Sequence, residues 1–307
     1  AHVPVGELEM AQNKINQLYS ILLSERTKAL FERFTLVVAI ISFVVHLGLI
    51  YLNKFIPIFG GESDLLGNPI GAIYTPFSFI LLYEVYLLIY YLPRSITTYI
   101  SKQYEIISLI IIRRLFKDLS NLKLSSDWFS IKDDLQFTYD IIASVLLFYL
   151  IYWFYRLNKR RKHLTDQNQT LVQSVEKFVT LKRIISVCLV PILLVLALYS
   201  FGNWCYELLL HGGSDFEAIK NVNSVFFDEF FTILIIVDVI LLLVSFFYTD
   251  KFHKVIRNSG FVISTILIRL SFSVDGLVNT ALIVFAVGFG LLILAIHNIY
   301  EKQEMET

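Results

Sequence analysis

Charged residues are scarce in this sequence, and so are the residues that punctuate soluble and secreted folds. Only 17% of the 307 residues are charged, whereas a soluble domain carries about 25%. With six prolines, 13 glycines and two cysteines, the chain resembles neither a disordered protein nor a disulfide-bonded secreted scaffold. Lysine and arginine together (26) equal aspartate and glutamate (26), so the basic excess of a nucleic-acid-binding protein is missing too.

The sequence also lacks the residue sets that catalysis and metal binding need. Cys188 and Cys205 would lie roughly 25 Å apart on one helix, too far for a disulfide. Neither cysteine has a nearby partner, the six histidines show no ligand spacing, and no phosphate loop or nucleophile–base set is visible. We therefore expect no enzyme activity, no metal and no cofactor.

Long apolar runs are what the sequence does contain. Hydrophobic residues make up 56% of the chain, and the mean hydropathy is +0.65. A bilayer core about 30 Å thick needs roughly 20 apolar residues per helix. The segments that qualify are 34–52, 72–92, 137–155, 184–201, 230–248 and 274–296. Segments 99–116 and 256–272 are shorter and carry charges, so the alternatives are eight spans, or six spans with two interfacial helices.

The placement of basic residues favours eight spans. With a cytoplasmic N terminus and eight spans, most lysines and arginines fall in inner segments, including the cluster 156–162. Cationic loops stay cytoplasmic during insertion. The outer loops then hold only Lys54, Lys117, Lys123, Lys132 and Lys220. This predicts an integral membrane protein with both termini in the cytoplasm.

The two halves of the chain repeat the same features in the same order, about 150 residues apart. An arginine preceded by a charged residue opens the first span of each half, and a Gly-Gly segment with acids follows that span. An acid lies in the second span, an arginine near the end of the third, and another acid before the fourth. These features are Glu32-Arg33 and Lys182-Arg183, 60–64 and 212–215, Glu84 and Asp238, Arg113 or Arg114 and Arg269, and Asp134 and Asp275.

This order predicts an all-α polytopic membrane protein. Its eight transmembrane helices would form two parallel four-helix repeats with cytoplasmic helical extensions, because four spans per half give both halves the same orientation. The expected divisions are a cytoplasmic amphipathic N-terminal helix (1–30), a first membrane repeat (31–156), a cytoplasmic helical hairpin or linker (157–182), a second membrane repeat (183–298) and a cytoplasmic tail (299–307). We expect the N-terminal helix to run into the first span.

The charges inside the spans are the main candidate site residues. Glu84 and Asp238 lie near mid-membrane, where an acid costs roughly 2.5–3.5 kcal/mol and should face a partner or water. We expect Glu84 to pair with Arg113 or Arg114, and Asp238 to pair with Arg269. Three alternatives follow: the pairs lock two helices together, the charges line a pathway, or the arginines extend to the outer headgroups. Secondary candidates are Glu105, Asp134 and Asp275.

The second half resembles the phosphate-starvation-inducible E (PsiE-like) family of small four-span bacterial membrane proteins. The resemblance rests on Asp238, the basic turn 251–257 with His253 and Arg257, segment 263–270 with Arg269, Asp275, and the small apolar last span around Ala281. The first half departs from it, with no histidine in the basic turn and an additional Glu105. The resemblance implies two fused PsiE-like units, a bacterial inner (plasma) membrane location and a stress-response setting, but no particular activity.

Two functions fit this sequence. The first is permeation of ions or small solutes, or its regulation. The alternative is a non-conducting membrane scaffold, or a stress or defence effector, that binds a partner through its cytoplasmic helices. The expected partners are the lipid bilayer and either further copies of the chain or a membrane-complex partner; no nucleic acid is expected.

Overall fold

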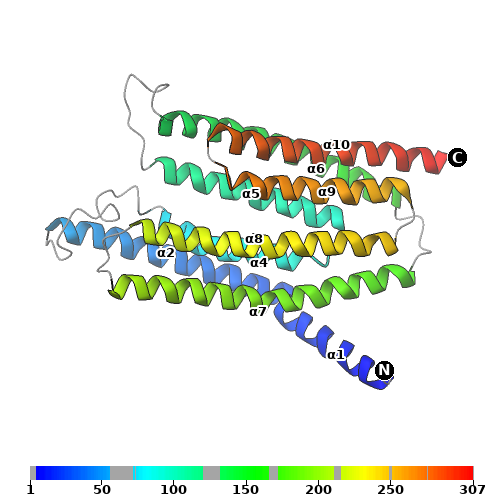
Figure 1. The fold of residues 1–307 in the computed structure, drawn as a ribbon, viewed down its shortest axis with the longest axis horizontal. Coiled ribbons are helices and arrows are strands. Elements are labelled where there is room, and N and C mark those ends of the chain that lie inside the picture. Colours follow the sequence, from blue (N-terminus) through cyan, green and yellow to red (C-terminus); the bar gives the residue numbers. More distant parts are fainter. Residues whose placement is uncertain are drawn as a thin grey trace. The chain divides into compact units, whose positions relative to one another are not determined.

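The computed structural model describes residues 5–55, 72, 74–119, 132–165, 172–210, 216–248, 251–274 and 276–306. Within these ranges the regular structure is helical and contains no strand, which confirms the all-α class (Figure 1). The helices are α1 (Val5–Leu22), α2 (Glu25–Phe55), α4 (Tyr74–Tyr91), α5 (Ile96–Leu119), α6 (Lys132–Thr165), α7 (Val172–Leu210), α8 (Phe216–Phe247), α9 (Phe252–Ser271) and α10 (Leu277–Glu306).

Five of the described helical segments are long and apolar enough to cross a membrane. They are Asn13–Leu52, Leu135–Lys159, Glu176–Tyr199, Glu229–Phe247 and Leu277–Glu304. Thr75–Tyr91 in α4 is apolar but shorter. The two segments that the sequence marked as polar, 99–116 and 256–272, fall largely in α5 and α9, which do not meet the same length and hydropathy criterion.

Serine caps explain two of the helix boundaries. The N-terminal segment does not run unbroken into the first span, because α1 ends at Leu22 and α2 begins at Glu25. The hydroxyl of Ser24 accepts a hydrogen bond from the amide of Thr27 at 3.1 Å, which stabilises a new helix start. Ser95 accepts from the amide of Thr98 in the same way at the start of α5.

The chain divides into two compact units, which are described separately. Unit 1 comprises Ala1–Pro93 and Thr180–Thr232, and unit 2 comprises Arg94–Val179 and Ile233–Thr307. Each unit therefore takes helices from both of the expected sequence repeats. Both arms of the expected hairpin are helical where described, since α6 continues to Thr165 and α7 begins at Val172.

In unit 1, α2 packs against α4 through tyrosine side chains. The hydroxyl of Tyr86 donates to the carbonyl of Leu22 at 2.9 Å, and the hydroxyl of Tyr90 donates to the carboxylate of Glu25 at 2.5 Å. These rings thus connect α4 to the point where α1 ends and α2 begins.

Unit 2 is a bundle in which α10 packs on α9 and α6, and α5 packs on α6 and α9 (Figure 1). The bundle is closed by a close helix approach at Gly290. A Cβ at this position would lie 1.8 Å from the hydroxyl of Tyr104, which bonds to the Ser264 hydroxyl at 2.7 Å. Gly276, with φ of 76°, permits the tight turn from α9 into α10.

Candidate functional site

The interior of unit 2 contains many polar side chains among its apolar ones, while large apolar side chains lie on its surface. Many polar side chains of α5 and α9 are buried, namely Thr97, Ser101, Gln103, Ser108, His253, Arg257, Asn258, Ser264, Thr265, Arg269 and Ser271. Large apolar side chains point outward from α6 and α10, such as Val145 (65% exposed) and Phe285 (62%). This distribution is typical of helices surrounded by lipid, where polar groups must find partners inside the protein.

Asp238 and Arg269 meet in this interior. Nη2 of Arg269 on α9 lies 2.9 Å from Oδ2 of Asp238 on α8, and both side chains are at least nine-tenths buried. The two residues singled out from the sequence as partners are thus in direct contact.

Two side chains of α5 complete the coordination of Asp238. The hydroxyl of Tyr99 donates to Oδ1 at 3.0 Å, and Nε2 of Gln103 lies 3.5 Å from Oδ2. Tyr99 and Gln103 are themselves buried. One carboxylate therefore connects three helices (α5, α8 and α9), and sequence inspection identified only two of them.

Arg114 has a partner that the sequence analysis did not identify. Its guanidinium binds the carboxylate of Asp140 on α6 at two points, Nε to Oδ2 at 2.5 Å and Nη2 to Oδ1 at 2.7 Å. Asp140 is completely buried. The expected contact of Glu84 with Arg113 or Arg114 stays a prediction: Glu84 is a buried residue of unit 1, and Arg113 is a half-buried residue of α5 in unit 2.

Neutral polar groups surround the Arg114–Asp140 pair. Nη1 of Arg114 donates to Oδ1 of Asn279 at 2.8 Å, and the hydroxyl of Thr280 donates to Oδ1 of Asp140 at 2.7 Å. Nε2 of Gln136 donates to the same oxygen at 3.0 Å. Helices α5, α6 and α10 are joined here at the end of unit 2 that we call the outer end.

The secondary candidates have varied positions. Nζ of Lys102 lies 2.6 Å from Oε2 of Glu105, and the hydroxyl of Tyr155 on α6 donates to the other oxygen, so Glu105 connects α5 to α6. Asp134 lies in α6, but its side chain is not among the described ones. Asp275 lies outside the described residues.

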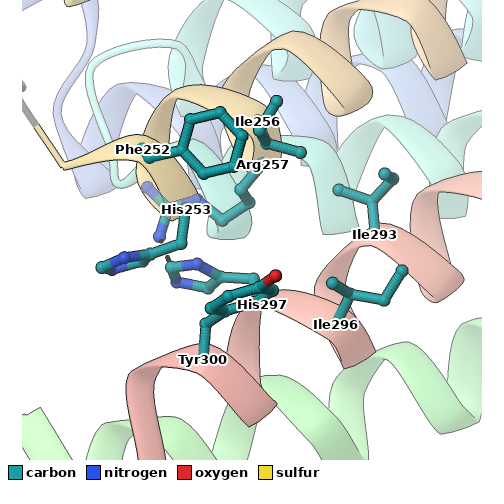
Figure 2. Close-up of a pocket in the computed structure, with 8 residues that line it drawn as sticks. All are labelled: Phe252, His253, Ile256, Arg257, Ile293, Ile296, His297 and Tyr300. Carbon is teal, nitrogen blue, oxygen red and sulfur yellow. Dashed lines mark hydrogen bonds between the residues drawn. The ribbon is translucent and has the colours of Figure 1, made fainter. Parts of the chain in front are cut away.

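His253 and Arg257 lie together at the opposite end of unit 2, which we call the inner end (Figure 2). Nη1 of Arg257 lies 3.0 Å from Nε2 of His297 on α10, and Nη2 of Arg257 donates to Oδ1 of Asn258 at 3.0 Å. Since a guanidinium can only donate, Nε2 of His297 is the acceptor. The rings of His253 and His297 lie side by side, with centroids 5.0 Å apart.

Glu304 orients His253. Its Oε1 lies 3.3 Å from Nδ1 of His253, and its Oε2 lies 2.6 Å from Nζ of Lys251. Burial lowers the pKa of His253, and the charge of Glu304 opposes that shift. The bonds to Lys251 are the main reason that the pKa of Glu304 is lowered. A small pocket adjoins this cluster, with Phe252, Ile256 and Ile296 on its apolar side.

No family model, curated protein or solved structure matches this chain. The resemblance to the PsiE-like family therefore stays a prediction from sequence motifs. Among the described residues, no group of three or more His, Cys, Asp or Glu side chains could hold a metal ion.

Proposed function

We propose that this chain is an integral membrane protein with eight spans that lets ions or small solutes cross, with the pathway between α5 and α9 of unit 2. In this proposal the two polar helices are enclosed by α6, α8 and α10, whose apolar side chains face lipid. Both termini and the inner end of unit 2 face the cytoplasm. The Asp238–Arg269 and Arg114–Asp140 pairs lie along the pathway and close it when formed.

The observation that carries this proposal is the burial of Asp238 and Arg269 with hydrogen-bonding groups from a third helix. Ionisable residues inside a membrane are expensive, and they mark ion or substrate pathways more often than random positions do. Two polar helices at corresponding positions of two repeats are also a feature of transporter binding sites. Helices α5 and α9 are the third spans of the two proposed repeats.

The arrangement in unit 2 also supports the proposed duplication. Helices α5 and α6 would be the third and fourth spans of the first repeat, and α9 and α10 those of the second. Packing of α5 on α9 and of α6 on α10 brings corresponding helices together. A pseudo-two-fold axis along the membrane normal would produce such pairs. In this proposal each repeat corresponds to one four-span unit of the PsiE-like family.

Flux measurements in liposomes test the permeation proposal. Purified protein would be reconstituted with ions and a size-graded series of uncharged solutes trapped inside. We expect protein-dependent release up to a size limit, and a changed rate or ion selectivity in the double variant Asp238→Asn/Arg269→Gln. The matched control is Val145→Ala, which alters an outward-facing side chain of α6. No release of any ion or solute above that of empty liposomes would contradict permeation.

A non-conducting scaffold is the second candidate, and α1 is the observation that favours it. Leu18 and Ile21 of α1 are 47% and 56% exposed, although both are large and apolar. Such side chains suit contact with a partner protein or with the membrane surface. Absence of flux, together with loss of a co-purifying partner after Leu18→Glu/Ile21→Glu, would favour this function.

A further inference from the structure

We propose that the inner end of α9 and α10 binds an acidic phospholipid, whose phosphate lies at the first turn of α9 and whose acyl chain follows Phe252 and Ile256. This inference rests on the membrane location in the proposed function, and it does not depend on permeation. The site comprises His253, Lys254, Phe252 and Ile256 of α9 with Ile296 of α10.

The first turn of α9 favours a negatively charged ligand. Its N-cap residue, Lys251, forms no side-chain capping hydrogen bond, and the turn contains no acidic residue. The amide groups and the positive dipole end of a helix N terminus attract phosphate. Lys251 and Lys254 add positive charge to the same turn, although Lys251 already pairs with Glu304.

His253 provides the second, independent observation. Its side chain is more than nine-tenths buried and lines the pocket, and its Nε2 has no hydrogen-bond partner among the described residues. The carboxylate of Glu304 faces Nδ1, so this nitrogen carries a proton and leaves Nε2 for a ligand. An imidazolium held in this way donates from Nε2 to a phosphate oxygen, as a carboxylate-oriented histidine does in many sites.

The pocket walls indicate that the ligand also has an apolar part. Phe252 is 71% exposed and Ile256 is 41% exposed, and Ile296 on α10 continues this apolar surface. Figure 2 shows Phe252 and Ile256 on one side of the pocket and the two histidine rings on the other. A phosphate beside an acyl chain has this combination of charge and apolar surface. Basic pockets at the cytoplasmic ends of membrane helices bind acidic headgroups for the same reason.

The electrostatics of the cluster predict proton uptake on binding. Without a ligand, burial holds the pKa of His253 down, and Lys251 and Lys254 act in the same direction. Glu304 and Glu301 act in the opposite direction. Arg257, His297 and Tyr300 are the other charged or titratable side chains that line the pocket. A phosphate near Nε2 stabilises the imidazolium and raises this pKa, so the lipid should bind more tightly as the pH falls from 8 to 6.

Lipid titrations of the full chain in dodecyl maltoside test the site. Dioleoyl-phosphatidylglycerol is the probe, dioleoyl-phosphatidylcholine is the neutral control, and binding is followed by native mass spectrometry. At pH 6 we expect phosphatidylglycerol to bind about 10-fold more tightly than phosphatidylcholine. We expect His253→Gln and Lys254→Gln each to reduce the affinity for phosphatidylglycerol about 5- to 10-fold. The matched control is Lys159→Gln, which neutralises an exposed lysine of α6 and should change little.

Three results would overturn the inference. One is equal affinity for the two lipids. Another is equal loss of affinity in Lys159→Gln and Lys254→Gln, which would indicate a diffuse charge effect. The third is inorganic phosphate binding as tightly as the lipid, since the acyl chain would then contribute nothing. If His253→Gln does not fold, the pH dependence of lipid binding in the unmodified chain still decides: affinity that is constant between pH 8 and 6 contradicts the role of His253.

Discussion

Arg114 of α5 and Asp140 of α6 form a two-point ion pair, in which Nε lies 2.5 Å from Oδ2 and Nη2 lies 2.7 Å from Oδ1. This planar contact matches the fork of a guanidinium to both carboxylate oxygens. Because Asp140 is completely buried and Thr280 and Gln136 also donate to it, the pair is the central polar contact at the outer end of unit 2.

Removing one partner of this pair should destabilise the protein more than removing both. Asp140→Asn would leave the Arg114 charge without its carboxylate, and breaking a buried pair costs about 3–5 kcal/mol. The double variant Arg114→Gln/Asp140→Asn should be more stable than the less stable single variant. Thermal unfolding in detergent measures the stability of the unmodified protein, of the two single variants and of the double variant. Strictly additive losses would show that the two side chains are not coupled.

A methyl group at Gly290 should disrupt the packing of three helices. A Cβ there would lie 1.8 Å from the Tyr104 hydroxyl and 3.2 Å from the Ser264 hydroxyl. We expect Gly290→Ala to lower the unfolding free energy by about 1–3 kcal/mol through overpacking. The control is Gly288→Ala on the same helix, where a Cβ has nothing within 4 Å. The second variant should be neutral or slightly stabilising, because alanine favours helix.

Tyr104→Phe should partly restore the stability of Gly290→Ala. Removing the hydroxyl takes away the atom nearest to the added methyl group, although it also breaks the 2.7 Å bond to Ser264. Unfolding temperatures of the single and double variants measure this compensation. If Gly290→Ala destabilises the protein equally with Tyr104 and with Tyr104→Phe, the close approach of Gly290 to the Tyr104 hydroxyl is contradicted.

Protonation of His253 should destabilise the lipid-free protein at acidic pH. Its pKa is lowered in the folded state from the ordinary value of 6.5, so the unfolded chain takes up the proton first as the pH falls. Stability should therefore be constant above about pH 7 and decrease below about pH 6.5. Melting temperatures between pH 8 and 5.5, compared with His253→Gln, measure this effect. The same slope in both proteins would assign it to other groups.

The proposed direction of α9 and α10 across the membrane can be tested by labelling. In a variant without Cys188 and Cys205, a cysteine replaces either Ser273, between the two helices, or Lys302, near the end of α10; both positions are exposed. Eight spans with cytoplasmic termini predict that an impermeant thiol reagent labels the first from outside the cell only. The second should react only after the membrane is opened. Labelling of both positions from the same side would contradict the topology.

The sequence predicted the helical class and the Asp238–Arg269 contact, because both follow from local pattern. The acid and the arginine are single charges in the apolar parts of the consecutive helices α8 and α9, so each is the partner of opposite charge that the sequence offers the other. For Arg114 the same reasoning did not identify the partner that the structure shows, Asp140 on α6, the next helix of unit 2.

Asp140 and the inner-end contacts were harder to find. Asp140 lies within an otherwise apolar segment, but the search for corresponding acids in the two halves favoured Asp134. On α10, Asn279 and Thr280 contribute to the Arg114 network instead of an acid. His297 is distant in sequence from Arg257, and only the packing of α10 on α9 brings them together. The contacts of Asn279 and Thr280 join α10 to α5 and α6, which are not consecutive with it, and such contacts depend on the arrangement of the bundle, which a single sequence does not specify.

Cysteine modification in the interior of unit 2 tests the proposed pathway most directly. Ser264 is completely buried between Tyr104 and the α10 backbone, midway between the inner and outer polar clusters. In a variant without native cysteines, Ser264→Cys would be reconstituted in liposomes and treated with a small cationic methanethiosulfonate. Its control is Val145→Cys on the apolar surface. We predict that the reagent blocks flux through Ser264→Cys and leaves Val145→Cys unaffected. Undiminished flux after complete modification of Cys at position 264 would contradict a pathway between α5 and α9.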